Sequence, residues 1–147
     1  MNKTDANHVE DVPVLEMWKR LKSDPKAVLV DVRTRAEWAF VGVPDLSSLG
    51  RDVLLIEWQT FPDNWVATDF ADRLEKALTE RGVQKDDEIF FICRSGGRSR
   101  MAAEAMAAAG YRHCLNVAEG FEGPMDADRH LGQIAGWKFE GLDWVQG

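Results

Sequence analysis

The chain has 147 residues, 45% of them hydrophobic, and a formal net charge of −7 at pH 7. This length predicts one domain that buries about two-thirds of the surface of the unfolded chain, and six tryptophans favour a packed core over disorder. The acidic balance argues against a nucleic acid or an anionic membrane as partner, because both are bound by basic surfaces.

The N-terminal segment is polar and acidic and contains no apolar run like that of a signal peptide. We therefore expect a flexible tail over residues 1–11 and a single domain over residues 12–147. No segment reaches the length of a membrane-spanning helix. Two cysteines do not make a disulfide framework, so the composition favours a reducing, cytoplasmic environment.

Helical and strand-like stretches alternate along the domain. Apolar residues at helical spacing predict amphipathic helices, and short continuous apolar runs predict strands that are buried on both faces. The expected helices lie over residues 13–23, 68–81 and 101–109, with a short helix or turn over residues 34–40. The expected strands lie over residues 27–32, 53–58, 89–92 and 113–117.

Strands that alternate with helices imply a parallel sheet. The expected fold is an α/β domain with a parallel central sheet of about five strands and helices on both faces. A loop over residues 41–50 and an aromatic-rich connection over residues 61–65 lie between these elements. Towards the C-terminus, a helix over residues 126–135 and an extended stretch over residues 137–139 are expected, and residues 142–144 form the ending. Their tryptophans predict that this end packs back onto the domain.

A strand, a loop with two adjacent glycines and a helix meet at Cys93. Such a turn gathers backbone N–H groups around one point and directs the N-terminus of a helix at it. Arg94 and Arg98 add positive charge in a chain that is acidic overall. Oriented amides and positive charge stabilise a thiolate, so we expect Cys93 to be a nucleophile in an anion-binding loop.

Three motifs resemble the rhodanese family of sulfurtransferases. Cys93-Arg94-Ser95-Gly96-Gly97-Arg98-Ser99 closely resembles the active-site loop of that family. Leu29-Val30-Asp31-Val32-Arg33, followed by Glu37-Trp38, is similar to its early motif, and Asn116-Val117-Ala118-Glu119-Gly120-Phe121 is similar to its late motif. The match covers most of the chain from residue 12 onward. It departs at Val41-Gly42-Val43-Pro44-Asp45-Leu46, where many relatives have Gly-His-Ile-Pro-Gly-Ala.

The resemblance implies a rhodanese-like three-layer fold and a rhodanese-type thiosulfate sulfurtransferase. Cys93 would take a sulfane sulfur from a small anionic donor such as thiosulfate, hold it as a persulfide and pass it to cyanide or a thiol. Substrate and sulfur would be bound by the loop residues Arg94, Ser95, Gly96, Gly97, Arg98 and Ser99. Supporting roles are expected for Asp31, Arg33, Glu37 and Trp38. No cofactor is expected, because the persulfide is a covalent intermediate.

The loop residues carry more specific expectations. Side chains at Gly96 and Gly97 would block the tight curl of the backbone. Arg94 would contact the entering substrate or stay solvated at the rim of the pocket. Arg98 would bind the anion or form a salt bridge under the loop. The Ser99 hydroxyl would cap the following helix or donate to the sulfur.

The supporting residues favour structural roles. Asp31 and Arg33 are expected to pair with neighbours and brace the loops, and Glu37 is expected to pair with Arg33. Trp38 is expected to pack in the core or to wall the pocket. Cys114 is expected in the core, and neither cysteines nor histidines have the spacing of a metal site.

Loop length separates sulfur transfer from its main rival. Cysteine phosphatases have one more residue between the cysteine and the arginine, because a phosphoryl group needs a wider ring of amides. Only four residues separate Cys93 from Arg98, so a phosphatase or arsenate reductase is the less favoured alternative. A carrier that delivers the sulfur to a protein partner stays open. A non-catalytic binding module is disfavoured, because such modules commonly lack the cysteine.

Overall fold

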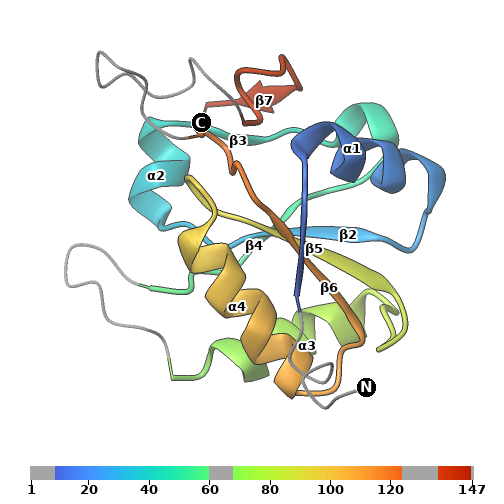
Figure 1. Cartoon of the computed structure of the whole chain (residues 1–147). Coiled ribbons are helices and arrows are strands. Elements are labelled where there is room, and N and C mark those ends of the chain that lie inside the picture. Colours follow the sequence, from blue (N-terminus) through green and yellow to red (C-terminus); the bar gives the residue numbers. More distant parts are fainter. Residues whose placement is uncertain (1–8, 60–67, 124–135, 147) are drawn as a thin grey trace.

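A computed structural model describes residues 9–59, 68–123 and 136–146 of the chain. Its centre is a five-stranded parallel sheet in the order β1-β6-β5-β2-β4 (Figure 1). The strands are β1 (Glu10–Val12), β2 (Val28–Asp31), β4 (Leu54–Leu55), β5 (Glu88–Ile92) and β6 (His113–Val117). The helices are α1 (Val14–Ser23), α2 (Arg35–Phe40), α3 (Phe70–Glu80) and α4 (Gly97–Ala108). A second, small sheet pairs β3 (Val43–Pro44) with β7 (Trp144–Val145).

The alternation of side chains along β5 divides the core into two layers. Ile89, Phe91 and Cys93 pack with residues of α3 and α4, whereas Phe90 and Ile92 pack with residues of α1. β5 lies between β6 and β2 in the middle of the sheet, and helices cover both of its faces. This is the physical reason for its continuous apolar sequence. The predicted α/β fold, with a parallel sheet and helices on both faces, is confirmed.

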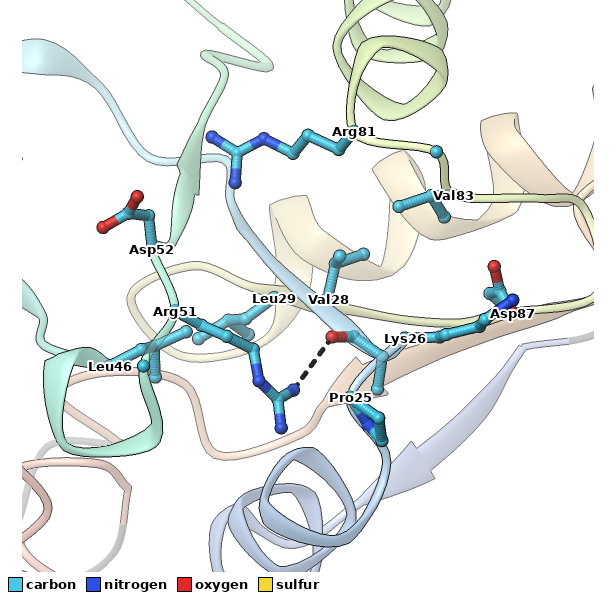
Figure 2. A pocket seen from close by; sticks show the side chains of 13 residues that line it. Pro25, Lys26, Val28, Leu29, Leu46, Arg51, Asp52, Arg81, Val83 and Asp87 are labelled. Carbon is cyan, nitrogen blue, oxygen red and sulfur yellow. Dashed lines mark hydrogen bonds between the residues drawn. The ribbon is translucent and has the colours of Figure 1, made fainter.

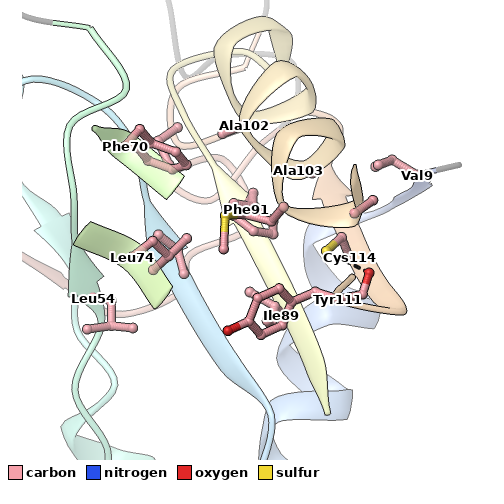
Figure 3. Packing of buried hydrophobic residues seen from close by; sticks show 14 of the residues in the cluster. Val9, Leu54, Phe70, Leu74, Ile89, Phe91, Ala102, Ala103, Tyr111 and Cys114 are labelled. Carbon is pink, nitrogen blue, oxygen red and sulfur yellow. Dashed lines mark hydrogen bonds between the residues drawn. The ribbon is translucent and has the colours of Figure 1, made fainter. Parts of the chain in front are cut away.

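Small side chains let α4 lie close to the sheet. Ala102, Ala103 and Ala107 are buried in the same cluster as Phe91 and Cys114. Figure 3 shows Ala102 and Ala103 on the side of α4 that is directed at β5. The close approach places the first turn of α4 next to the end of β5, where Cys93 begins the loop.

The structure corrects the boundary of the predicted N-terminal tail. Glu10 and Asp11 were expected in the tail, but they belong to β1, which pairs with β6 from Glu10 opposite Leu115 to Val12 opposite Val117. A three-residue edge strand is held by backbone hydrogen bonds and buries only one side chain, Val12. Such a strand has no apolar pattern that could predict it.

Other predicted elements differ in length. The strand expected over residues 53–58 is reduced to β4, and α4 begins at Gly97 instead of residue 101. The loop expected over residues 41–50 contains β3 and a 3₁₀ helix, Ser47–Leu49. The predicted connection over residues 61–65 and the predicted helix over residues 126–135 lie outside the described residues.

The C-terminal end packs back on the domain, as its tryptophans predict. Trp137 is fully buried, with its ring 5.7 Å from that of Trp18 on α1. The stretch expected to be extended over residues 137–139 instead forms a turn, and β7 follows it. No helix in the described part of the chain has the length and apolar character to cross a membrane.

Candidate active site

Cys93 lies at the carboxyl end of the central strand, and its residue is 1% exposed. In the register of the sheet, Asp31 of β2 is aligned with Ile92 of β5, so the residues after both strands meet at one edge. The Val32 N–H donates to the Ile92 carbonyl at 2.9 Å and extends this pairing. In parallel α/β sheets, ligands bind at this edge.

Three groups of the loop and of α4 lie around the sulfur. The backbone N–H groups of Gly96 and Ser99 donate to Cys93 Sγ at 3.2 and 3.3 Å, and the Ser99 hydroxyl oxygen lies 3.3 Å from it. Gly96 is the N-cap residue of α4, and Ser99 is in its first turn. Because N–H groups at a helix start have no partner inside the helix, they are available to an anion. The loop is therefore a cradle for a negatively charged sulfur.

Two glycines, Gly96 and Gly120, let the backbone curl around the sulfur, and the sequence predicts only the first of them. Gly96 has a φ of 107°, and a Cβ there would collide with the Ala118 carbonyl. Gly97 begins α4, and a Cβ there would meet nothing within 4 Å. Gly120 of the late motif has a φ of 70°, and its Cβ would collide with the carbonyls of Cys93 and Arg94. Gly96 and Gly120 are thus required by geometry, and the expected requirement at Gly97 is wrong.

Arg98 forms an ion pair with Glu37. Its Nη1 and Nη2 donate to the two carboxylate oxygens of Glu37 at 2.7 and 2.9 Å. The Thr34 N–H also donates to this carboxylate, at 3.1 Å, and the Thr34 hydroxyl accepts from the Glu37 N–H, so the two residues form the capping box of α2, with Thr34 as N-cap. The expectation that Glu37 pairs with Arg33 is wrong, because α2 directs Glu37 at the active-site loop.

This ion pair shifts the pKa values of both of its members. Burial by itself raises the pKa of Glu37, but the hydrogen bonds and charge of Arg98, together with Thr34, outweigh it, and the pKa lies below its ordinary value. The hydrogen bond to Glu37 raises the pKa of Arg98 against its own burial. Both groups therefore stay charged beside the sulfur at neutral pH.

Asp31 and Arg33 form a second ion pair, which is fully buried. Arg33 Nη2 donates to Asp31 Oδ2 and to the Gly42 carbonyl, both at 2.7 Å. The guanidinium carbon lies 4.2 Å from the centre of the Phe121 ring. The Phe121 N–H in turn donates to the Cys93 carbonyl at 2.8 Å. The pair is thus connected to the active-site loop through Phe121.

An open pocket of about 690 Å³ lies beside the loop. Arg94, Arg98, Glu37 and Phe40 are among its lining residues. Arg94 and its neighbour Ser95 are exposed, and the Arg94 side chain makes no ion pair or hydrogen bond with the residues that the structure describes. Arg94 is therefore free to meet an anion that enters from solvent.

The remaining predicted residues do not contact the sulfur. Trp38 is half-buried on α2, and its indole nitrogen has no partner among the described residues. Cys114 is 4% exposed, and burial raises the pKa of its thiol to about 12. Both cysteines are free, and Cys114 lies in the core, as expected. No group of potential metal ligands occurs in the described parts of the chain.

A second hollow of about 450 Å³ lies at the opposite edge of the sheet (Figure 2). It is lined by Lys26, Val28 and Asp87, which precede or begin β2 and β5, so it is at the amino ends of the strands. Arg51 spans it and donates to the Ala27 carbonyl at 3.1 Å. No residue of the active-site loop lines this hollow, so it is separate from Cys93.

Three residues of the late motif touch the loop, although sequence reasoning assigned no role to Asn116 and Gly120 and favoured core packing for Phe121. Asn116 Nδ2 donates to the Gly96 carbonyl at 3.1 Å, Phe121 binds the Cys93 carbonyl, and Gly120 packs against it. The motif marks the segment, but only the pairing of β6 with β5 brings it to the loop.

Comparison with known proteins agrees with this geometry. The family model of the rhodanese-like domain matches residues 14–126. The uncharacterized protein RC0915 of Rickettsia conorii is 35% identical over 136 residues, which is 92% of this chain and 97% of that protein. A sulfurtransferase of Allochromatium vinosum is 27% identical over 76% of this chain and 84% of that protein.

Two solved structures show the same fold. The crystal structure of Rv0390 from M. tuberculosis has a TM-score of 0.84 and 46% identity, covering 95% of this chain and 99% of that chain. The polysulfide-sulfur transferase of Wolinella succinogenes has a TM-score of 0.61 at 19% identity, covering 97% of this chain and 82% of that chain. With the family model, the motifs and the cysteine loop in agreement, the chain belongs to the family of rhodanese-like domains.

Proposed function

We propose that the protein is a sulfurtransferase that moves a sulfane sulfur from a donor such as thiosulfate to a thiophilic acceptor through a persulfide on Cys93. One observation carries this proposal: two backbone N–H groups at the start of α4 converge on Cys93 Sγ. They stabilise the ionised sulfur that must attack the donor. A reduced thiol is required for this chemistry, and we propose a cytoplasmic location for that reason.

The proposed reaction has two balanced steps. The Cys93 thiolate attacks the sulfane sulfur of thiosulfate, the S–S bond of thiosulfate breaks, and sulfite leaves with the bonding electron pair. The resulting persulfide anion stays on Cys93 in the cradle of amides. Cyanide or a thiolate then attacks the outer sulfur, and the Cys93 thiolate is released as the leaving group. Arg94, exposed at the pocket beside the loop, would attract the anionic donor.

Mass spectrometry of the intact protein tests the first step. After incubation with thiosulfate, the wild-type protein should gain roughly 32 Da, one sulfur atom, and cyanide should remove it as thiocyanate. Cys93→Ser should gain nothing. Absence of the adduct on wild type, or its persistence in Cys93→Ser, would contradict the proposal. The same preparations should not turn over aryl phosphate or arsenate, because the loop is one residue shorter than that of cysteine phosphatases.

A persulfide carrier in a protein relay is the second candidate, and Phe40 favours it. Phe40 lines the pocket beside the loop and is 79% exposed. Aromatic residues are enriched in protein–protein interfaces, so an exposed one next to Cys93 favours a protein partner. A carrier would release its sulfur slowly to cyanide and rapidly to a protein acceptor. Phe40→Ser should then slow transfer to the protein acceptor without changing transfer to cyanide. Equal rates to both acceptors in wild type would favour the stand-alone enzyme.

A further inference from the structure

Asn116 brings a buried amide to the active site from the neighbouring strand. It lies on β6 directly beside Phe91 of β5, so its side chain is on the same face of the sheet as Cys93. The residue is 3% exposed. Its amide reaches the start of α4, where it contacts both Gly96 and Ser99.

The partners of the amide nitrogen determine how the amide is oriented. Asn116 Nδ2 lies 3.0 Å from Asp11 Oδ1 and 3.1 Å from the Gly96 carbonyl oxygen. A carboxylate and a carbonyl only accept hydrogen bonds, so both N–H groups of the amide must face them. Arg100 donates to the same Asp11 oxygen and holds that carboxylate in place. The amide oxygen is consequently directed at the Ser99 hydroxyl, 2.5 Å away.

The Ser99 hydroxyl has one proton and two neighbours that could receive it. Asn116 Oδ1 lies 2.5 Å from Ser99 Oγ, and Cys93 Sγ lies 3.3 Å from it. Because Oδ1 carries no proton, the short contact requires Ser99 to donate to it, and the sulfur then faces the lone pairs of Oγ. To donate to an ionised sulfur instead, the hydroxyl must leave a buried amide oxygen without a donor, which is unfavourable.

We propose that Asn116 is a positioning residue that holds the hydroxyl proton of Ser99 away from Cys93. Among the groups that lie around the sulfur, the backbone N–H groups of Gly96 and Ser99 are then the ones that donate hydrogen bonds to its anion. This inference rests on the proposed function of Cys93 as the sulfur-carrying nucleophile. A sulfur anion that accepts fewer hydrogen bonds is more basic and a stronger nucleophile. Asn116 thereby keeps the sulfur reactive in a loop whose amides and arginines stabilise its charge.

The charged groups around the loop are the same in every variant that tests this. They come from the loop and α4, from α2, from the end of β2, from the C-terminal turn and from β1, namely Arg94, Arg98, Arg100, Glu37, Asp31, Arg33, Lys138 and Asp11. Differences between the variants therefore report on the hydroxyl and the amide.

The test is the pH profile of alkylation by iodoacetamide, an uncharged probe that reacts with the thiolate. The profile is measured for wild type, Asn116→Ala, Ser99→Ala and the double variant. In Asn116→Ala the hydroxyl is free to donate to the sulfur, so the pH of half-maximal rate should fall by about one unit. The limiting rate at high pH should fall about threefold, because a less basic thiolate is a weaker nucleophile. The double variant should lose this shift, because the hydroxyl is absent.

Two outcomes would overturn the inference. The first is a profile of Asn116→Ala that is unchanged or moved to higher pH, which is what simple damage to the loop would cause. The second concerns Ser99→Ala, a small change that also serves if Asn116→Ala does not fold. The profile of Ser99→Ala should move slightly to lower pH, since the Cys93 thiol loses the hydroxyl oxygen that accepts its proton. A move to higher pH would show that the hydroxyl donates to the thiolate in the wild type, which would overturn the inference.

The alkylation profile does not depend on sulfur transfer. If the thiosulfate adduct fails to form while the profiles behave as expected, the proposed function is wrong and the positioning role stands. If the adduct forms on wild type while the profiles contradict the expectation, only the role of Asn116 is wrong.

Discussion

The carboxylate of Glu37 connects the start of α2 with the start of α4. It accepts a hydrogen bond from the Thr34 backbone, which caps α2, and two from Arg98, which lies in the first turn of α4. One side chain thus fixes a short helix and the active-site loop relative to each other. The pair is partly buried, with 21% of each side chain exposed, so water weakens it less than a surface pair.

The Glu37–Arg98 pair should make stability depend on pH. The pKa of Glu37 is lower in the folded protein than its ordinary value of 4.5, so the pair stabilises the fold above that value and loses its effect as the pH falls through the folded pKa. Glu37→Gln keeps an acceptor for the helix cap but removes the charge. Urea unfolding should show a loss of about 1–3 kcal/mol at pH 7 and a much smaller loss once the pH has fallen below the folded pKa of Glu37. Equal losses at both pH values would show that the charge is unimportant.

Arg94 should contribute to binding of the sulfur donor and not to the reactivity of the Cys93 thiol. Arg94→Ala removes a positive charge that has no partner in the described structure, so the free energy of unfolding should change by less than about 0.5 kcal/mol. The KM for thiosulfate should rise severalfold, and the effect should shrink at high salt. Arg94→Lys serves as the matched control and should retain most of the affinity. A KM that is the same for all three proteins would remove Arg94 from the binding site.

The two adjacent glycines of the loop should respond differently to alanine. Gly96→Ala forces a side chain into a left-handed backbone conformation and against the Ala118 carbonyl, so a loss of roughly 2–4 kcal/mol and of persulfide formation is expected. Gly97→Ala places a helix-favouring residue in open space and should be neutral or stabilising by up to about 1 kcal/mol. Thermal or urea unfolding of the two variants gives the comparison. Similar losses at both positions would contradict the geometry of the loop.

Removing Arg33 should destabilise the protein more than removing both members of its buried pair. Arg33→Met leaves the Asp31 carboxylate buried without its partner, with an expected loss of about 3–5 kcal/mol. Asp31→Asn combined with Arg33→Met removes both charges and should restore part of the loss. Unfolding in urea measures the free energy of unfolding of the wild type, the single variants and the double variant. If the double variant is less stable than Arg33→Met, the pair is not the cause of the loss.

Labelling by iodoacetamide at neutral pH should modify Cys93 and leave Cys114 untouched. Burial raises the pKa of the Cys114 thiol to about 12, so at pH 7 it stays protonated and does not react as a thiolate. The native Cys93→Ser protein should therefore remain unmodified, and unfolding in urea should expose Cys114 to the reagent. Peptide mass spectrometry distinguishes the two sites. Modification of Cys114 in the folded protein would show that the core around β6 opens readily.

The elements that were predicted well are those whose burial shows as a pattern of apolar side chains in consecutive residues. β5 is covered on both faces, and its apolar run precedes the cysteine and glycines that identify the loop. β1 and β4 are edge strands of a few residues, and backbone pairing with a neighbour defines them more than side chains do. Glu37 was expected to pair with Arg33 because the two are close in the chain, yet it pairs with Arg98, 61 residues away.

From its residue order alone, the chain specifies the alternation of helices and strands, the position of Cys93 after a buried strand and the short loop that follows it, because these depend on local periodicity and on neighbouring residues. The partners of that loop come from the pairing of β5 with β2 and β6, which brings Glu37, Phe121 and Asn116 around it. Side chains that meet across strands are separated by tens of residues in the sequence, and no local pattern records which of them will touch.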